Sequence, residues 1–482
     1  MSEVVKVNPV LEKINDFSDK LSPMLVKELR QGMRGMGFVI LFIALQALLV
    51  LVMIGFSTAS SYGNSGESLS STLIAFFSLA VMFVQPLRGI TALSSEIKGK
   101  TIDLMVLTKL SAWRIVFGKW VSLVGQSGLI LVTLLPYMIM RYFFGGMQLF
   151  AEIALLLLIF VASAALTALT VGLSAVPSII LRGIVCLIGG FFLLQTISMG
   201  VIFAREGLVD ALTLSDPDAL YGLLAFIGVS GYVMWLSLDF GASLIAPLAE
   251  NRSTPRKLIG YGLVVLATLL MMPVDEDAAL ILGWILILPL ALTALTEHPY
   301  LVPQVCLPFV RKFGVGNVTG RVLYPGWASG VFYVASLFVI LQVLNAISGF
   351  ELFDDDELHA TVINSFSILV FPLVVYRLFF RKSANIFGIY LAVMMFTWLV
   401  GLLALVLAEV TDQDGLLLLF CWLPTANLFG TFSLGNSYEG TMIAFGYLSY
   451  IAYSAIALVT SKVVWKHVRE SELAAEELIE KK

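Results

Sequence analysis

The sequence predicts an all-α, polytopic membrane protein, on the evidence of its composition and the length of its apolar runs. Of the 482 residues, 59% are hydrophobic and only 13% are charged, and the mean hydropathy is +0.95. That balance is too apolar for a water-soluble chain of this length. The apolar runs are continuous and about twenty residues long, which suits helices that cross a ~30 Å hydrocarbon layer, whereas a membrane barrel needs shorter alternating strands.

Twelve apolar segments are expected to cross the membrane. Their ranges are 36–58, 72–93, 115–140, 149–175, 183–203, 222–248, 258–273, 279–296, 327–349, 362–380, 385–408 and 441–463. The stretch 415–432 is apolar as well, but Pro424, Asn427 and Gly430 interrupt it. We therefore expect a re-entrant or broken element there that does not cross.

The basic residues give these spans one consistent orientation. Of the 29 Lys and Arg residues, 26 fall in the N-terminal segment and in 94–120, 176–183, 249–258, 297–326, 376–385 and the tail from 461; the exceptions are Arg88, Arg141 and Arg205. Acidic clusters at 275–277 and 354–357 occupy the opposite loops. By the positive-inside rule both termini are expected in the cytoplasm, and the charged first 35 residues do not resemble a signal peptide.

Four regions follow from these patterns. We expect a cytoplasmic N-terminal segment at 1–35 with an amphipathic interface helix, a six-span region at 36–250, a second six-span region at 251–465 and a charged cytoplasmic tail at 466–482. The boundary is placed at the most polar cytoplasmic break, near 250–258. From Glu470 onward we expect an exposed helix or a frayed tail.

The loop between the second and third spans, "SSEIKGKTIDLMVLTKLSAWRIVFGKW", is the most informative stretch. Its Gly-Lys-Thr also ends a phosphate-binding P-loop, but that motif needs a glycine where Ser94 stands and a β-strand before it. Apolar residues at spacings of three and four, with charges between them, predict an amphipathic helix against the inner membrane face. Lys119 is expected to extend its ammonium back to the lipid headgroups.

This loop resembles the first cytoplasmic loop of the permease subunits of type-2 ABC exporters. The positions that match the family pattern in register are Glu96, Thr101, Asp103, Leu104, Leu107, Thr108, Leu110, Ser111, Gly118 and Lys119. Lys100 stands where the family has glycine, Lys109 where it has proline, and Arg114 often has an acidic counterpart. The segment "SPMLVKELRQGMRG", with Glu28 and Arg30, is similar to the family's interface helix. The resemblance covers residues 20–250.

The resemblance implies a bacterial inner-membrane pore subunit that acts as a homodimer or a heterodimer with another permease. A separate ABC ATP-binding subunit would dock on the N-terminal helix and on loop 94–120 and would hydrolyse ATP, so this chain is expected to be no enzyme and to hold no cofactor or nucleic acid. Three alternatives stay open. The loop can be a basic amphipathic helix that holds anionic lipid, and the chain can be an ion-coupled secondary transporter or a non-transporting scaffold.

Ionisable groups within the spans are the remaining candidates for function. Asp239, in the sixth span, is the candidate functional carboxylate, with Arg88 as a candidate partner. Arg88 and Glu152 lie near helix ends, where we expect them to act as anchors. The three cysteines and three histidines have no metal-ligand spacing, so the cysteines are interpreted as packing residues.

Overall fold

The computed structural model of the protein is helical over the residues that it describes. These are 23–59, 65–100, 110–143, 149–178, 182–183, 217–247, 250–273, 276–311, 315–348, 356–383, 385–411, 415–433 and 439–480. Within these ranges no strand occurs, and 10 helices are long and apolar enough to cross a membrane. Ala279–Leu295 is a further, shorter apolar helix. The predicted all-α polytopic membrane fold is confirmed.

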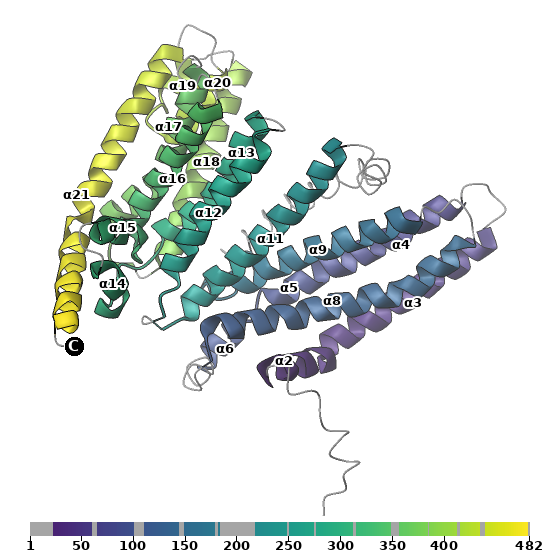
Figure 1. Ribbon diagram of the computed structural model, residues 1–482. Coiled ribbons are helices and arrows are strands. Elements are labelled where there is room, and N and C mark those ends of the chain that lie inside the picture. The colour runs from purple at the N-terminus through teal and green to yellow at the C-terminus, as the bar shows by residue number, and fades with distance from the viewer. Residues whose placement is uncertain are drawn as a thin grey trace, which may run out of the picture. The chain divides into compact units, whose positions relative to one another are not determined.

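The chain divides into two compact units, Met1–Ala246 and Pro247–Lys482. The first unit contains α2 (Pro23–Arg34), α3 (Met36–Ala59), α4 (Ser65–Leu79), the π-helix η1 (Ala80–Val84), α5 (Gln85–Gly89), α6 (Ser94–Lys98), α8 (Ala112–Tyr142), α9 (Leu149–Leu173) and α11 (Pro217–Ile245). The second contains α12 (Ser253–Met271), α13 (Glu276–Leu295), α14 (Pro303–Val310), α15 (Val315–Leu323), α16 (Trp327–Ser348), α17 (Asp356–Phe379), α18 (Ile386–Thr411), α19 (Gly415–Leu418), α20 (Pro424–Ser433) and α21 (Glu439–Glu480). Figure 1 labels the α-helices of both units.

The second membrane segment is less regular than the sequence predicts. Instead of one helix over 72–93, α4 widens into η1 and continues as the short helix α5, in which Pro86 lies in the first turn. Proline has no amide hydrogen to donate to the carbonyl four residues earlier, so a wider π turn before it is a common accommodation. The predicted span 183–203 lies, apart from Gly183, outside the described residues.

Helices α9 and α11 approach closely because both carry glycine at their contact. A Cβ atom on Gly172 would lie 2.0 Å from the carbonyl oxygen of Ser237, and one on Gly241 would lie 2.8 Å from the Cα atom of Gly172. Small residues allow such backbone contact between membrane helices, where packing rather than the hydrophobic effect drives association. The side of α9 that faces its neighbours is accordingly rich in buried Ala, Ser and Thr.

A buried ion pair joins α8 and α9 at the ends that the topology predicts to be outside. Arg141 is fully buried, and its guanidinium lies 2.5 Å from Glu152 Oε1. Ser70 of α4 donates a hydrogen bond of 2.9 Å to the other carboxylate oxygen. The expectation that Glu152 is a surface anchor is therefore wrong, because its charge is paired inside the helix bundle instead of being solvated.

The interrupted stretch 415–432 forms two short helices, α19 and α20, separated by a turn. The 10 residues of α20 span about 15 Å, half of the hydrocarbon thickness. Asn427 in α20 accepts a hydrogen bond of 2.8 Å from Asn364 in α17 and donates one of 2.9 Å to the carbonyl of Met442. These amide contacts hold the broken element against its neighbours.

The last helix corrects the prediction for the tail. The 42 residues of α21 continue well past the predicted span 441–463, and one side of the tail is buried instead of frayed. Glu472 is 1% exposed and lies 3.4 Å from Arg321 of α15 and 3.7 Å from Arg469. Ser471 donates a hydrogen bond to the carbonyl of Leu301. Charged residues alternate with Leu and Ala in the tail. One face of the helix, which includes Glu472 and Ala475, is therefore buried against α14 and α15.

Candidate coupling site

A buried ion cluster links three elements of the first unit that lie far apart in sequence. The ammonium of Lys119, in α8, lies 2.7 Å from Glu96 Oε1 in α6 and 3.4 Å from Glu28 Oε2 in α2. The side chains of Lys119, Glu28 and Glu96 are only 9%, 12% and 17% exposed. We call these three residues the Lys119 cluster. It ties the amphipathic N-terminal helix to both ends of loop 94–120.

Close packing of α2 on α8 brings these charges together. A Cβ atom on Gly32 of α2 would lie 2.4 Å from Nε2 of Gln126 and 2.8 Å from Oγ of Ser122, so a larger residue there would displace these side chains. On the opposite side of the contact, Gly125 leaves room for a leucine of α2. Ser122 donates a hydrogen bond of 2.9 Å to the backbone carbonyl of Glu28. The interface helix is thus fixed to the third membrane span.

The charges of the cluster are balanced locally. Lys27 lies 3.9 Å from the second carboxylate oxygen of Glu28, so two ammonium groups face the two carboxylates. The expectation that Lys119 reaches back to the lipid headgroups is wrong, because its ammonium is buried and paired with the carboxylates of α2 and α6. A lysine held between two carboxylates in such a place loses much of its solvation, and the ionic contacts offset that loss.

Arg88 extends this polar contact deeper into the first unit. Its guanidinium donates hydrogen bonds to Gln85 in α5, at 2.9 Å, and to Gln126 in α8. It also lies over the ring of Phe38 in α3, 5.7 Å from the centroid. Arg88 is therefore bonded to two amides and not to Asp239, which is 4% exposed in α11. The candidate Asp239–Arg88 pair is not formed.

The backbone conformation of Lys100 shows why the family pattern has glycine at this position. Its backbone has a φ of +54°, in the left-handed region that glycine adopts without strain. The amides of Gly99 and Lys100 bond to the carbonyls of Ser95 and Ile97, as at a helix C-terminus that ends in a left-handed residue. The glycine that the resemblance places at this position is the residue that this backbone favours.

Replacing Lys100 by glycine is expected to stabilise the protein by about 1 kcal/mol, because it removes the cost of a left-handed side-chain-bearing residue. The melting temperature of the detergent-purified protein measures the effect. The same replacement at Lys98, the last residue of α6, is the matched control, and it should destabilise because glycine weakens a helix. If both changes destabilise the protein, the claim that the left-handed backbone of Lys100 is strained is wrong.

The structure brings together some of the predicted docking residues and leaves others undescribed. Glu28, Glu96 and Lys119 form the Lys119 cluster, and the backbone carbonyl of Ser111 accepts the first amide bonds of α8. Gly118 is buried in α8, and Arg30 is exposed on α2. The remaining predicted residues, Thr101, Asp103, Leu104 and Thr108, lie outside the described residues, as does most of the predicted amphipathic helix of the loop.

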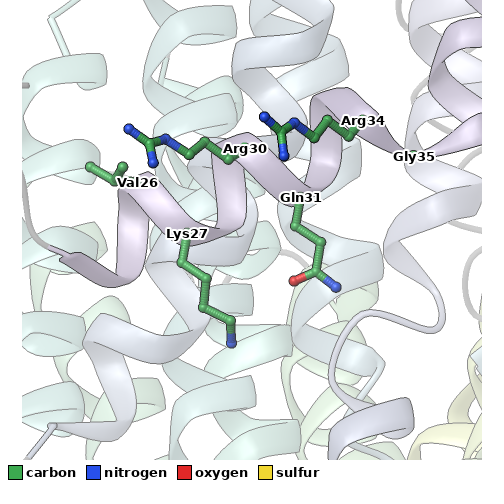
Figure 2. A pocket seen from close by; sticks show the side chains of 6 residues that line it. All are labelled: Val26, Lys27, Arg30, Gln31, Arg34 and Gly35. Carbon is green, nitrogen blue, oxygen red and sulfur yellow. The ribbon is translucent and has the colours of Figure 1, made fainter. Parts of the chain in front are cut away.

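The side of α2 that faces away from α8 lines an open groove of about 720 Å³. Its lining residues are Val26, Lys27, Arg30, Gln31, Arg34 and Gly35. Figure 2 shows that Arg30 and Arg34, one helical turn apart, project from the same side of α2, whereas Lys27 and Gln31 project from another side. We call this hollow the α2 groove. It presents three cationic side chains directly before the first membrane span.

A second buried charge cluster lies in the second unit. Glu297 accepts hydrogen bonds from Arg256, from Ser253 at 2.8 Å and from the amide of Gly326 at 3.0 Å, and Lys257 lies 3.4 Å away. Burial acts to raise the pKa of Glu297, but Lys257 and Arg256, with the two hydrogen-bond donors, hold that pKa below its ordinary value. We call this set the Glu297 cluster.

Sequence reasoning missed the partners that make these clusters possible. Gln85 and Gln126 are polar residues inside apolar spans, which is the one signal that could have marked them. The role of Gly32 has no such signal, because it depends on which helix packs beside it. Glu297 begins a loop rich in proline and gave no pattern of its own. The described residues contain no group of three or more His, Cys, Asp or Glu side chains placed to hold a metal ion.

Comparison with known proteins returned no matching family model, no matching curated protein and no matching solved structure.

Proposed function

We propose that the chain is the membrane subunit of an ABC transporter, which moves its cargo with work received from a separate ATP-hydrolysing subunit. The observation that carries the proposal is the Lys119 cluster. It connects α2 and the start of loop 94–120, the two parts that the resemblance assigns to docking, with the third span. A displacement of α2 or of the loop would be transmitted to α8 through ionic contacts of 3.4 Å and 2.7 Å, respectively.

A rigid connection of this kind is what mechanical coupling needs. Glu96 and Lys119 are only partly accessible, so solvent screens their attraction less than it would screen a surface pair. Close packing at Gly32 and the hydrogen bond from Ser122 to the carbonyl of Glu28 add non-ionic contacts between α2 and α8. The exposed residues beside the cluster, Lys98 and Lys100 among them, remain accessible to a partner.

The proposal is tested by reconstituting the chain with the ABC ATPase that co-purifies with it in mild detergent. The chain alone should hydrolyse no ATP, and the pair should hydrolyse ATP faster than the ATPase alone. Exchanging both Glu96 and Asp103 for alanine should remove this stimulation. Since Glu96 also holds Lys119, the exposed Lys98→Glu provides a docking variant outside the cluster, and we expect it to weaken binding about tenfold, or about 1.4 kcal/mol.

The matched control is Lys466→Glu, an equal charge change on an exposed residue of α21. It should leave binding and stimulation unchanged. A complex that assembles and hydrolyses ATP normally with Glu96→Ala/Asp103→Ala and with Lys98→Glu would rule out docking at this loop.

Ion-coupled secondary transport is the second candidate, and one observation favours it. The broken element α19–α20 carries the buried amide of Asn427, bonded to Asn364, and interrupted helices with polar groups are typical of secondary-transporter sites. Vesicles that contain only this chain distinguish the two functions. Accumulation of cargo under an imposed ion gradient without any ATPase would favour this second function.

A further inference from the structure

The α2 groove is lined by three cationic side chains, those of Lys27, Arg30 and Arg34. Glu28 and Glu96 are matched by Lys119 and by Lys27, as described above. Arg34 is exposed and forms no ion pair within the described part of the chain. It lies one turn from Arg30 and on the same side of α2 (Figure 2). Like charges four residues apart on a helix repel, and an anion held between them would offset that repulsion.

The chemistry of two neighbouring guanidinium groups favours a phosphate. Arginine presents planar donors that pair with phosphate oxygens in a bidentate manner, and two such side chains can hold one phosphate group from two directions. The groove of about 720 Å³ leaves room for a headgroup beside the arginines, and Gln31 adds an amide donor. A phosphate monoester or diester is therefore the expected ligand group.

The position of the groove indicates that this phosphate belongs to a lipid. Only Gly35 separates Arg34 from the first membrane span, so the arginine lies at the level where lipid headgroups meet the hydrocarbon. Met36, the first residue of α3, is 76% exposed. A soluble phosphate compound would gain nothing from the apolar surface that follows.

A second hollow on α3 has the character of an acyl-chain site. It is almost wholly apolar, has a volume of about 540 Å³ and is lined by Phe42, Ile43, Gln46, Ala47, Val50 and Leu51. Its near edge, Phe42, lies about 10 Å along the helix from Gly35, within the ~15 Å of one leaflet. One molecule with its phosphate at the arginines could thus place a chain in this hollow.

We propose that the α2 groove and the α3 hollow together bind one anionic glycerophospholipid, with its phosphate between Arg30 and Arg34 and an acyl chain along α3. The bound lipid would hold the N-terminal helix at the membrane surface and fill the space beside the junction of α2 and α3. This site does not depend on the proposed transport function, because it is formed by the chain alone.

Binding is measured by native mass spectrometry of the full chain in neutral detergent, titrated with long-chain phosphatidylglycerol. Arg34→Gln should weaken binding about fivefold, and Arg30→Gln/Arg34→Gln should weaken it about twenty-five-fold, since each basic side chain near an anionic headgroup contributes a factor of that size. Phosphatidylcholine with the same chains should bind much more weakly. Wild-type binding of phosphatidylglycerol by the double variant would overturn the proposal.

Three further comparisons separate a lipid site from diffuse charge attraction, from a soluble phosphate ligand and from a protein contact. Arg114→Gln removes one exposed charge of the same unit and should leave binding unchanged; an effect equal to that of Arg34→Gln would show diffuse attraction and overturn the site. Inorganic phosphate should not displace the lipid, and displacement at equal concentration would assign the groove to a soluble phosphate compound.

Ala47→Trp fills the α3 hollow and should weaken lipid binding. A changed oligomeric state with unchanged lipid binding would assign that face to a second copy of the chain.

Discussion

Replacing Glu297 by alanine is expected to lower the free energy of unfolding by about 3–5 kcal/mol, because it leaves two buried cations without their carboxylate. The side chains of Arg256 and Lys257 are only 3% and 1% exposed. Lys257 keeps a hydrogen bond to the carbonyl of Tyr324, which does not neutralise its charge. Chemical denaturation of the detergent-purified protein, followed by circular dichroism, measures the loss.

Glu250→Ala is the matched control for this prediction. Glu250 pairs with Arg252 at 3.8 Å, and both side chains are about a quarter exposed, at 27% and 25%. An ion pair with that exposure contributes at most about 1 kcal/mol. Equal losses for Glu297→Ala and Glu250→Ala would mean that burial of the Glu297 cluster does not govern its energy.

The pH dependence of the same cluster has a definite sign. The pKa of Glu297 lies below its ordinary value of 4.5 in the folded protein, so its carboxylate stabilises the fold fully above pH 4.5. That contribution is lost as the pH falls through the lowered pKa. The stability difference between the wild type and Glu297→Gln should accordingly shrink as the pH is lowered below 4.5.

Lys119→Met is expected to cost about 3 kcal/mol and to loosen α2 from α8. Without the ammonium, the carboxylates of Glu28 and Glu96 face each other in a site where they are 12% and 17% exposed. Faster cleavage of the N-terminal segment by trypsin, in a time course at fixed enzyme concentration, reports the release of α2. Lys98→Met, on an exposed lysine of α6, should change neither the stability nor the cleavage rate.

A combined variant separates charge from packing at this position. Changing Glu28 and Glu96 to glutamine together with Lys119→Met removes all three charges, and it should recover most of the stability lost by Lys119→Met alone. If the triple variant is as unstable as the single one, the aliphatic packing of the lysine is responsible and the ionic account of the cluster is wrong.

The membrane helices could be predicted from sequence because each is marked by its own apolar run. The apolar run at 36–58 predicts α3 within a residue or two, and the run at 327–349 predicts α16 as closely. Hydropathy is a local property, so no knowledge of neighbouring helices is needed. The π turn before Pro86 and the buried face of the tail from Glu470 depend on tertiary packing, and the sequence pattern did not reveal either.

The candidate coupling site could be predicted only in part. Glu28, Glu96 and Lys119 are singled out by the resemblance, but nothing in their spacing indicates that they contact one another, since Lys119 and Glu28 are 91 residues apart. The contacts of the Lys119 side chain depend on where α2 lies, and α2 packs against α8 at Gly32. The left-handed backbone of Lys100 is consistent with the glycine of the family pattern. A lysine at this position does not by itself predict that conformation.

Docking of a separate ATPase on loop 94–120 is the central claim, and photo-crosslinking tests it most directly. A photo-crosslinking amino acid is placed at position 98 in α6 and, as the control, at position 466 in α21, both of which carry exposed lysines. Irradiation of the complex in membranes should join the chain to its ATPase from position 98 and not from position 466. An assembled, ATP-hydrolysing complex that gives no adduct from position 98, or equal adducts from both positions, would contradict the account.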